Sequence, residues 1–307
     1  MVALLMACAV LQKLRRPQVA MAATDAKMGQ QSDGLLVVGA GYLGQRVAKR
    51  WLGRYPNARV VGVTSTTASH ETLKAAGLEA KTSEELQASP EEVFPYVIFA
   101  APPRSRKGSD PAGYIASIDE AITHWDADEE GGFVFTSSGG VLAEDDGATV
   151  TEDSLVSESD SAKTLLEAEK HVTTAQGTVL RLAGLYDLRR GAHSYWLKAG
   201  IIKGREDGLI NLVHYDDAAD AVIAALRGGS VARRNLFLVG DGTPMSRREI
   251  VESARVAPEY KDSAMPKFEG SPAKGGLGKV YDTSRVRKTL GWTPRYKSFG
   301  QYMSAQR

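Results

Sequence analysis

The sequence predicts an α/β protein with a doubly wound parallel sheet and a small C-terminal lobe that contributes to a substrate site. Short apolar segments alternate with amphipathic helical segments over residues 34–240, which is typical of a parallel sheet covered by helices on both faces. The first apolar segment leads directly into the glycine-rich sequence GAGYLG. Beyond residue 240 the chain is rich in loops and glycines. We therefore expect residues 241–307 to form the lobe, with a contribution from residues 187–209.

The expected elements follow one another in a regular order. Apolar runs bounded by glycine or proline predict strands, and apolar residues three or four positions apart predict helices. Residues 209–229 are expected to hold a strand, a capped turn and a helix. The other expected strands are residues 35–41, 58–66, 96–103, 131–140, 177–186 and 235–241. The other expected helices are residues 42–55, 71–77, 111–125 and 161–175.

The composition excludes several classes of function. The net charge of +1 gives no electrostatic reason to expect nucleic acid or an anionic membrane as a partner. The single cysteine, Cys8, excludes an internal disulfide framework and a cysteine-based metal site. We expect a small-molecule substrate, no membrane span and no metal. A homodimer is compatible with the sequence, which does not fix the oligomeric state.

The first 33 residues differ from the rest of the chain. They hold no acidic residue before Asp25 but include Lys13, Arg15 and Arg16. The apolar run at residues 2–11 is too short to span a membrane, and its basic residues follow it, whereas those of a secretory signal precede it. The segment predicts a transit peptide for a plastid or mitochondrion. The alternative is a disordered tail on a cytoplasmic protein.

Three glycines lie between the first strand and the first helix. Gly39 permits a tight turn, Gly41 lets a pyrophosphate approach the backbone, and Gly44 lets helix and strand pack closely. Tyr42 and Leu43 begin the helix, whose free N–H groups and positive dipole end favour an anion. This context predicts dinucleotide binding and makes the sheet a Rossmann domain.

The end of the second strand indicates which dinucleotide binds. An acidic residue there favours NAD because it binds the ribose hydroxyls. This chain has hydroxyl residues instead, among them Thr64, Ser65 and Thr66. Hydroxyls can donate to a 2′-phosphate, and Arg46 is expected to add positive charge. We therefore expect NADP as the cofactor, with NAD as the alternative.

Four further segments, together with the glycine motif, resemble one enzyme family in the order of that family. They read FVFTSSGGV, RLAGLYD, INLVHYDDAADAVIAAL and VYDTSRVRKTLGWTPRY. The chain resembles the extended short-chain dehydrogenases/reductases, in particular their NAD(P)-dependent epimerase/dehydratase-like group with its atypical members. The resemblance covers roughly residues 34 to 300 and implies a Rossmann fold.

The resemblance also implies site residues. Ser138 takes the position of the family's strand serine, which bonds the substrate oxygen. Ala100, Ala101 and Pro102 end the third expected strand, where the family's chain lies against the cofactor. The family helix reads Tyr-x-x-Ser-Lys-x-x-x-Glu, and residues 159–167 fit it with Ser159 in the tyrosine position and Lys163 in the lysine position. Lysine in this motif holds the nicotinamide ribose and lowers the pKa of the tyrosine.

The missing tyrosine leaves three alternatives, because no tyrosine in the chain has a lysine four residues later. Another group donates the proton, with Tyr186, His193 and Tyr195 as candidates. Alternatively, the protein binds NAD(P) without turnover as a regulatory or scaffold protein. The third alternative is a register shift of two residues, in which Glu169 replaces Glu167 as the family's glutamate. We expect an NADP(H)-binding oxidoreductase or epimerase/dehydratase-like enzyme acting on a small hydroxyl or carbonyl compound.

Other charged clusters have simpler interpretations. His214, Asp216 and Asp217 superficially resemble a metal cluster, but the family resemblance implies a structural turn and a helix cap. The acidic loop at residues 144–160 is expected to be a solvated rim of the pocket. Three arginines are either ligands for an anionic sugar or nucleotide or surface charges: Arg181, Arg189 and Arg190.

Overall fold

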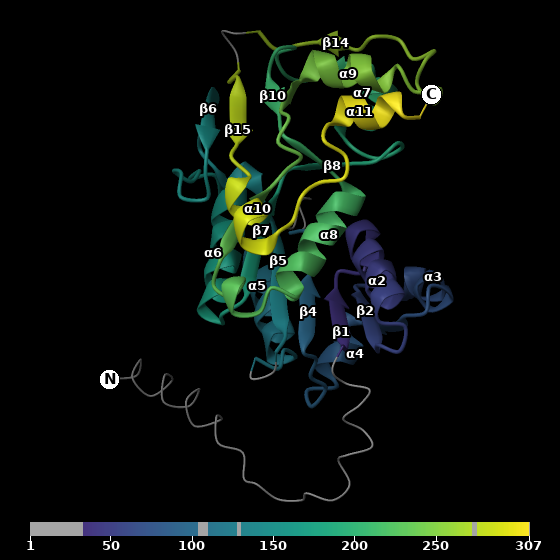
Figure 1. Ribbon diagram of the computed structural model, residues 1–307, viewed down its shortest axis with the longest axis vertical. Coiled ribbons are helices and arrows are strands. Elements are labelled where there is room, and N and C mark those ends of the chain that lie inside the picture. Colours follow the sequence, from purple (N-terminus) through teal and green to yellow (C-terminus); the bar gives the residue numbers. More distant parts are fainter. Residues whose placement is uncertain (1–32, 104–109, 128–129, 272–274, 307) are drawn as a thin grey trace, which may run out of the picture.

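A seven-stranded parallel sheet forms the centre of the protein, with strand order β12-β7-β5-β4-β1-β2-β3. The computed structural model describes residues 33–103, 110–127, 130–271 and 275–306. The expected transit peptide lies outside these residues. The sheet and its helices occupy the lower part of the view in Figure 1, and the small lobe lies above them. The doubly wound Rossmann fold is thereby confirmed.

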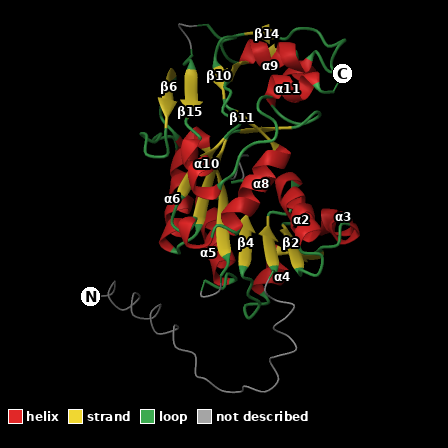
Figure 2. Cartoon of the chain, in the orientation of Figure 1, coloured by secondary structure: helices red, strands yellow, loops and turns green. Residues whose placement is uncertain are grey.

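The elements of the Rossmann domain alternate along the chain as expected (Figure 2). Its strands are β1 (Leu35–Val38), β2 (Val60–Thr64), β3 (Glu79–Thr82), β4 (Tyr96–Phe99), β5 (Gly132–Ser138), β7 (Thr178–Leu182) and β12 (Leu236–Val239). Its helices are α2 (Tyr42–Arg54), α3 (His70–Ala75), α4 (Ser83–Gln87), α5 (Pro111–Thr123), α6 (Asp160–Thr174), α8 (Tyr215–Leu226) and α10 (Ser284–Leu290). Short 3₁₀ turns lie at Thr67–Ser69, Gly139–Val141 and Gly229–Val231. No helix in the described ranges is both long and apolar enough to cross a bilayer.

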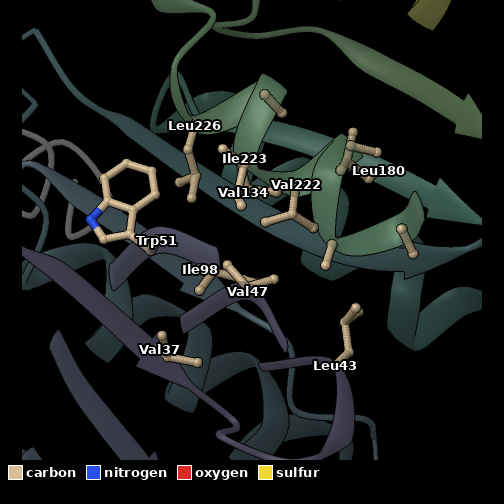
Figure 3. Close-up of a cluster of buried hydrophobic side chains, with 14 of the residues drawn as sticks. Val37, Leu43, Val47, Trp51, Ile98, Val134, Leu180, Val222, Ile223 and Leu226 are labelled. Carbon is tan, nitrogen blue, oxygen red and sulfur yellow. The ribbon is translucent and has the colours of Figure 1, made fainter. Parts of the chain in front are cut away.

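The strands are apolar on both faces because helices cover both faces of the sheet. In β1, Leu35 and Val37 join the core under α2 and α8, and Leu36 and Val38 join the core under α5 and α6. Figure 3 shows the first of these cores, in which Trp51 of α2 lies beside the sheet and α8. This two-sided burial explains why the strands read as continuous apolar runs rather than as alternating patterns.

One edge strand was not expected from the sequence. The segment EAKT (Glu79–Thr82) forms β3 and pairs with β2 alone. Its residues are partly or fully exposed, since an edge strand has solvent on one side. A polar run of four residues carries no periodic apolar signal, so the strand is missed without its tertiary context.

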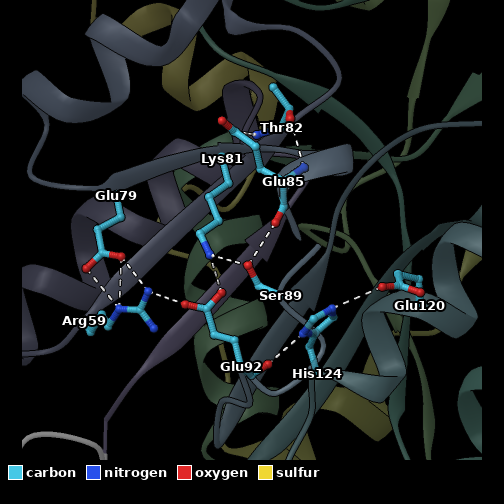
Figure 4. A network of polar contacts seen from close by, with 9 residues as sticks. All are labelled: Arg59, Glu79, Lys81, Thr82, Glu85, Ser89, Glu92, Glu120 and His124. Atoms are coloured by element: carbon cyan, nitrogen blue, oxygen red, sulfur yellow. Dashed lines mark hydrogen bonds and ion pairs between the residues drawn. The ribbon is translucent and has the colours of Figure 1, made fainter. Parts of the chain in front are cut away.

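An ion-pair network anchors this edge. Arg59 contacts Glu79 on β3 at 2.6 Å and also Glu92 before β4, and Lys81 contacts Glu92 at 2.6 Å (Figure 4). The network connects β2, β3 and the approach to β4 at the amino ends of the strands. The Arg59–Glu79 pair is exposed and contributes little individually, whereas Glu92 is largely buried between Arg59 and Lys81.

The small lobe has its own core. Tyr186, Phe299, Tyr302 and Met303 are its largest buried residues. Its helices are α7 (Ala192–Ala199), α9 (Arg247–Ala254) and α11 (Phe299–Ser304). Its strands are β8 (Gly184–Tyr186), β9 (Ile201–Ile202), β10 (Leu209–Ile210), β11 (Leu212–His214), β13 (Met245–Ser246) and β14 (Lys267–Phe268). Residues 187–209 enter this lobe through α7, which packs on α9, and through β9, which pairs with β14.

The chain then returns from the lobe to the Rossmann domain. Strand β15 (Gly278–Tyr281) pairs in parallel with β6 (Asp146–Val150), and α10 packs on β12. Val286 of α10 and Trp292 are buried in the larger core. Residues 278–292 therefore pack with the Rossmann domain, although lobe elements precede and follow them in the chain.

A buried ion pair joins α6 to the sheet. Arg181 of β7 contacts Glu169 of α6 at 2.7 Å, and both side chains are 5% exposed. Ser137 of β5 donates to the same carboxylate at 2.6 Å. Arg181 was expected to be a surface charge or an anion ligand, and both interpretations are wrong because its guanidinium is enclosed and neutralised.

We predict that Glu169→Gln destabilises the protein by about 3–5 kcal/mol, because it leaves the buried Arg181 without an anion. Urea unfolding measures the change in the free energy of unfolding. The matched control is Glu71→Gln on α3, whose partner Lys74 is 58% exposed, and its expected cost is below about 1 kcal/mol. Equal effects of the two variants would contradict the role of the buried pair.

Candidate cofactor and active site

A cavity of about 720 Å³ opens at the carboxyl ends of β1, β2 and β4. This is where a doubly wound sheet binds its ligand, because the strand order reverses there. Most of the residues predicted to bind the cofactor line it: Gly39, Gly41, Thr64, Ser65, Thr66, Ala100, Ala101 and Pro102. Tyr42, Leu43 and Gly44 begin α2 at one end of this cavity but are not among its lining residues.

The turn between β1 and α2 requires glycine at two positions. Gly39 has a φ of +88°, and a side chain there would come within 2.3 Å of the Ala101 backbone nitrogen. Gly44 would place a side chain 2.6 Å from the Gly39 carbonyl oxygen. These contacts bring β1, β4 and α2 together at the end of the cleft.

Gly41 is different, because its missing side chain faces open space. No atom lies within 4 Å of the place where its Cβ would stand, and the residue is exposed in the wall of the cavity. The first turn of α2 has no capping side chain and no acidic residue. A pyrophosphate fits this arrangement, because the helix N-terminus and the bare backbone both favour an anion.

The ribose side of the cavity is rich in hydroxyls. Thr64 is committed to the protein, since its Oγ1 donates to the Thr66 carbonyl at 2.9 Å and contacts His70 at 3.1 Å. Ser65 and Thr66 are exposed. The structure adds Ser69 and Ser83 to this wall and Tyr114 of α5 to the opposite one. No motif in the sequence indicated these three residues.

Arg46 does not contribute charge to this wall, and that expectation was wrong. Its guanidinium contacts Asp187 at 3.1 Å and Asp216 at 3.2 Å. It also donates to the Tyr42 hydroxyl at 2.8 Å, and that hydroxyl donates to Asp187. The cluster ties the first turns of α2 to the loop after β8 and to α8.

The residues predicted for catalysis lie apart from the cavity lining. Ser138 is exposed at the end of β5, and its Oγ accepts from the Gly140 N–H at 3.1 Å. Ser159 is the N-cap of α6, with its Oγ accepting from the Ala162 N–H at 3.3 Å. Lys163 is exposed on the first turn of α6. The capping contact gives Ser159 a structural task.

The burial of α6 distinguishes the two candidate glutamates. Glu167 is exposed, whereas Glu169 is buried against Ser137 and Arg181. If the buried residue is the family's glutamate, the register moves by two positions. Ser161 then stands in the tyrosine position and Leu165 in the lysine position, and α6 offers no catalytic pair.

The other proton donors considered from the sequence are poorly placed. Tyr186 is fully buried in the core of the lobe. His193 is also buried, contacts the Leu188 carbonyl at 3.1 Å, and has its pKa lowered by burial. Tyr195 is 71% exposed on α7. None of the three lines the cavity at the strand ends.

His214, Asp216 and Asp217 have structural tasks, as the sequence indicated. His214 caps α8 by accepting from the Asp216 N–H at 3.1 Å. Asp217 accepts from the backbone N–H groups of Arg295 and Tyr296 at 2.9 and 3.0 Å. Within the described ranges, no group of three or more histidine, cysteine, aspartate or glutamate side chains is arranged to hold a metal ion.

Three buried polar atoms have no hydrogen-bond partner among the described residues. They are the Tyr186 hydroxyl, His214 Nε2 and Asp241 Oδ2. Asp241 follows β12, and its Oδ1 accepts from the Thr243 N–H at 2.8 Å. Burial raises the pKa of Asp241 to about 7, and Asp217 adds to the effect. The Thr243 bond and the Arg287 cation oppose it.

No protein-family model matches the chain, and no curated protein matches it. Among solved structures, it is similar to a UDP-glucuronic acid 4-epimerase from Bacillus cereus in complex with UDP-glucuronic acid and NAD (20% identity, TM-score 0.69). That match covers 89% of this chain and 97% of the epimerase.

Two other structures show the same relationship. One is a dTDP-glucose 4,6-dehydratase from Bacillus anthracis with NAD (12% identity, TM-score 0.68, 89% of this chain and 96% of that one). The other is a functionally unknown conserved protein from Silicibacter pomeroyi (19% identity, TM-score 0.67, 89% and 97%). The chain therefore has the fold of the NAD-dependent epimerases and dehydratases, and the expected resemblance is confirmed in its fold.

We predict that Asp241→Asn stabilises the protein at pH 8 and flattens its pH dependence. The raised pKa means that the folded protein keeps a proton that the unfolded chain releases above its reference value of 3.8. Stability from this proton is complete below about pH 4 and is lost as the pH rises through 7. At about 1.4 kcal/mol per pKa unit, we expect a gain on the order of a few kcal/mol at pH 8.

Urea unfolding from pH 4 to pH 8 checks this expectation. Asp262→Asn, at an exposed position, is the control and should keep the pH dependence of the parent. A difference between Asp241→Asn and the parent that stays constant across this range would show that Asp241 does not titrate as inferred.

Proposed function

We propose that the protein binds NADP(H) and acts as an oxidoreductase or epimerase/dehydratase-like enzyme on a small hydroxyl or carbonyl compound. The observation that carries the proposal is the cavity at the carboxyl ends of β1, β2 and β4. It combines the open Gly41 position, an uncapped helix N-terminus and a wall of hydroxyls, which together suit a dinucleotide phosphate. The fold shared with NAD-dependent epimerases and dehydratases supports the same class.

The residues take separate roles in this proposal. The turn at Gly39 and Gly41 and the backbone of Tyr42 and Leu43 bind the pyrophosphate, while Ser65, Thr66, Ser69 and Ser83 surround the adenosine ribose. A bound nicotinamide supplies or accepts a hydride. Ser138, exposed at the end of β5, holds the substrate oxygen through its hydroxyl hydrogen. Three points remain predictions from the sequence. They are the formation of a homodimer, the role of Lys163 that the family motif implies, and targeting to a plastid or mitochondrion.

A second candidate is a protein that binds NAD(P) without catalysing a reaction. It is favoured by α6, where a capping serine and an exposed lysine stand in the positions of the catalytic pair. Purified protein mixed with NADPH and a panel of aldehydes and ketones separates the candidates. Oxidation of NADPH supports the enzyme, while tight binding without turnover across the panel supports the second candidate.

We predict that Gly41→Ala weakens NADP⁺ binding at least about tenfold, or about 1.4 kcal/mol, with little effect on stability. The new methyl group meets no protein atom within 4 Å, but it occupies the space where the pyrophosphate approaches. Isothermal titration calorimetry measures the dissociation constant. Gly53→Ala is the matched control, because its methyl group also meets nothing within 4 Å and lies at the far end of α2. Unchanged binding in Gly41→Ala would show that the pyrophosphate does not bind at this turn.

We predict that Ser65→Asp shifts the cofactor preference from NADP toward NAD. An acidic side chain at the end of β2 repels a 2′-phosphate and accepts hydrogen bonds from ribose hydroxyls. The ratio of the NADP⁺ to the NAD⁺ dissociation constant should rise at least about tenfold. Ser230→Asp adds the same charge at an exposed site outside the cavity and should leave the ratio unchanged. A parent protein that already prefers NAD⁺ would contradict the assignment of NADP.

A further inference from the structure

A tyrosine from the C-terminal segment lies against the loop that follows Ser138. Tyr281 is the last residue of β15, and its phenol packs on Gly139, the first residue after β5. A Cβ built on Gly139 would lie 2.1 Å from the Tyr281 hydroxyl oxygen. Only a glycine at this position lets the phenol approach the backbone so closely. The phenol therefore lies against the backbone at the end of β5, next to the residue that follows Ser138.

Asn211 fixes the strand that carries this tyrosine. Its Nδ2 donates to the Lys279 carbonyl at 2.8 Å, and its Oδ1 accepts from the Tyr281 N–H at 2.9 Å. On its other side, β15 pairs with β6, with Tyr281 opposite Val150. These contacts hold the backbone of β15 on both sides of Val280. The phenol consequently has little freedom to leave its place over Gly139.

The Tyr281 ring packs against the larger core and against the cluster that holds Val141 and Leu142, and its hydroxyl is unpaired among the described residues. It makes no hydrogen bond with any described residue, since the only bond recorded for Tyr281 outside the strand pairing uses its backbone N–H. It is also not one of the three buried, unpartnered polar atoms that are sealed from solvent. Burial raises the pKa of Tyr281 to about 12, and the nearby Arg181 opposes this shift. At neutral pH the phenol is therefore protonated and able to donate.

A lysine accompanies the tyrosine on the same strand. Lys279 lies two residues before Tyr281, so the two side chains share one face of β15. Its ammonium donates to the carbonyl of Leu142, at the end of the short helix that begins with Gly139. Burial lowers the pKa of Lys279, while Asp145 and Glu144 oppose the shift. A serine, a tyrosine and a lysine thus gather around residues 138–142, although none of them comes from α6.

We infer that Tyr281 is the acid/base residue of this protein and replaces the phenol that α6 lacks. The inference rests on the proposed function. In the direction of reduction, the substrate carbonyl carbon receives a hydride from the reduced nicotinamide cofactor. The carbonyl oxygen takes the phenolic proton, and the phenolate regains a proton from water. Oxidation of the alcohol runs through the same groups in reverse.

Tyrosine labelled with ¹³C at Cζ tests the inference by NMR at neutral pH. Comparison with Tyr281→Phe identifies the Tyr281 signal, and Tyr55→Phe identifies a control tyrosine at the amino end of the sheet. Saturating NADP⁺ should shift the Tyr281 signal and leave the Tyr55 signal unchanged. A Tyr281 signal that stays in place while NADP⁺ binds would overturn the inference and leave the proposed function intact. Absence of NADP⁺ binding would overturn both.

Turnover gives the second readout. Tyr281→Phe removes a hydroxyl that has no protein partner, so the fold, the melting temperature and the NADP⁺ affinity should remain those of the parent. Oxidation of NADPH with a carbonyl substrate should fall at least about 100-fold in Tyr281→Phe and stay unchanged in Tyr55→Phe. If Tyr281 merely fills the core, the two variants will have equal rates.

Discussion

The buried pair between Arg181 and Glu169 sets the position of α6, the helix that carries the segment resembling the family's catalytic motif. An uncompensated charge in the interior is strongly unfavourable, so the helix has one rotational setting in which Glu169 faces the sheet. That setting turns Lys163 and Glu167 toward solvent and leaves Ser159 as a cap. The buried pair therefore sets which residues of α6 face the sheet and which face solvent.

Much of the fold follows from the sequence because the central strands are buried on both faces. Runs such as LLVV (Leu35–Val38) and YVIF (Tyr96–Phe99) are apolar throughout, and such runs between helical segments predict a parallel sheet. The edge strand at Glu79–Thr82 lacks this signal, because solvent on one side allows polar residues. The pairing of β15 with β6 joins segments more than a hundred residues apart, and no local pattern indicates it.

The lining of the cavity at the strand ends is predictable only where the backbone geometry restricts the residue type. Close contacts require glycine at positions 39 and 44, and the glycine-rich motif GAGYLG reflects that requirement. Ser69 and Ser83 reach the cavity from separate elements and carry no motif. One acidic partner of Arg46, Asp187, lies 141 residues away, so a charge with no ion-pair partner nearby in the sequence is neutralised by the fold.

The return of residues 278–292 to the Rossmann domain has a consequence for folding during synthesis. Val286 and Trp292 complete the larger core, and they are synthesised after every lobe element from β8 to β14 but before α11. The core of the Rossmann domain is thus completed late in the chain, although the last strand of its sheet, β12, precedes α9 and β14. A chain that ends after β5 has both apolar faces of the half-sheet from β1 to β5 partly uncovered, because α6 and α8 follow β5.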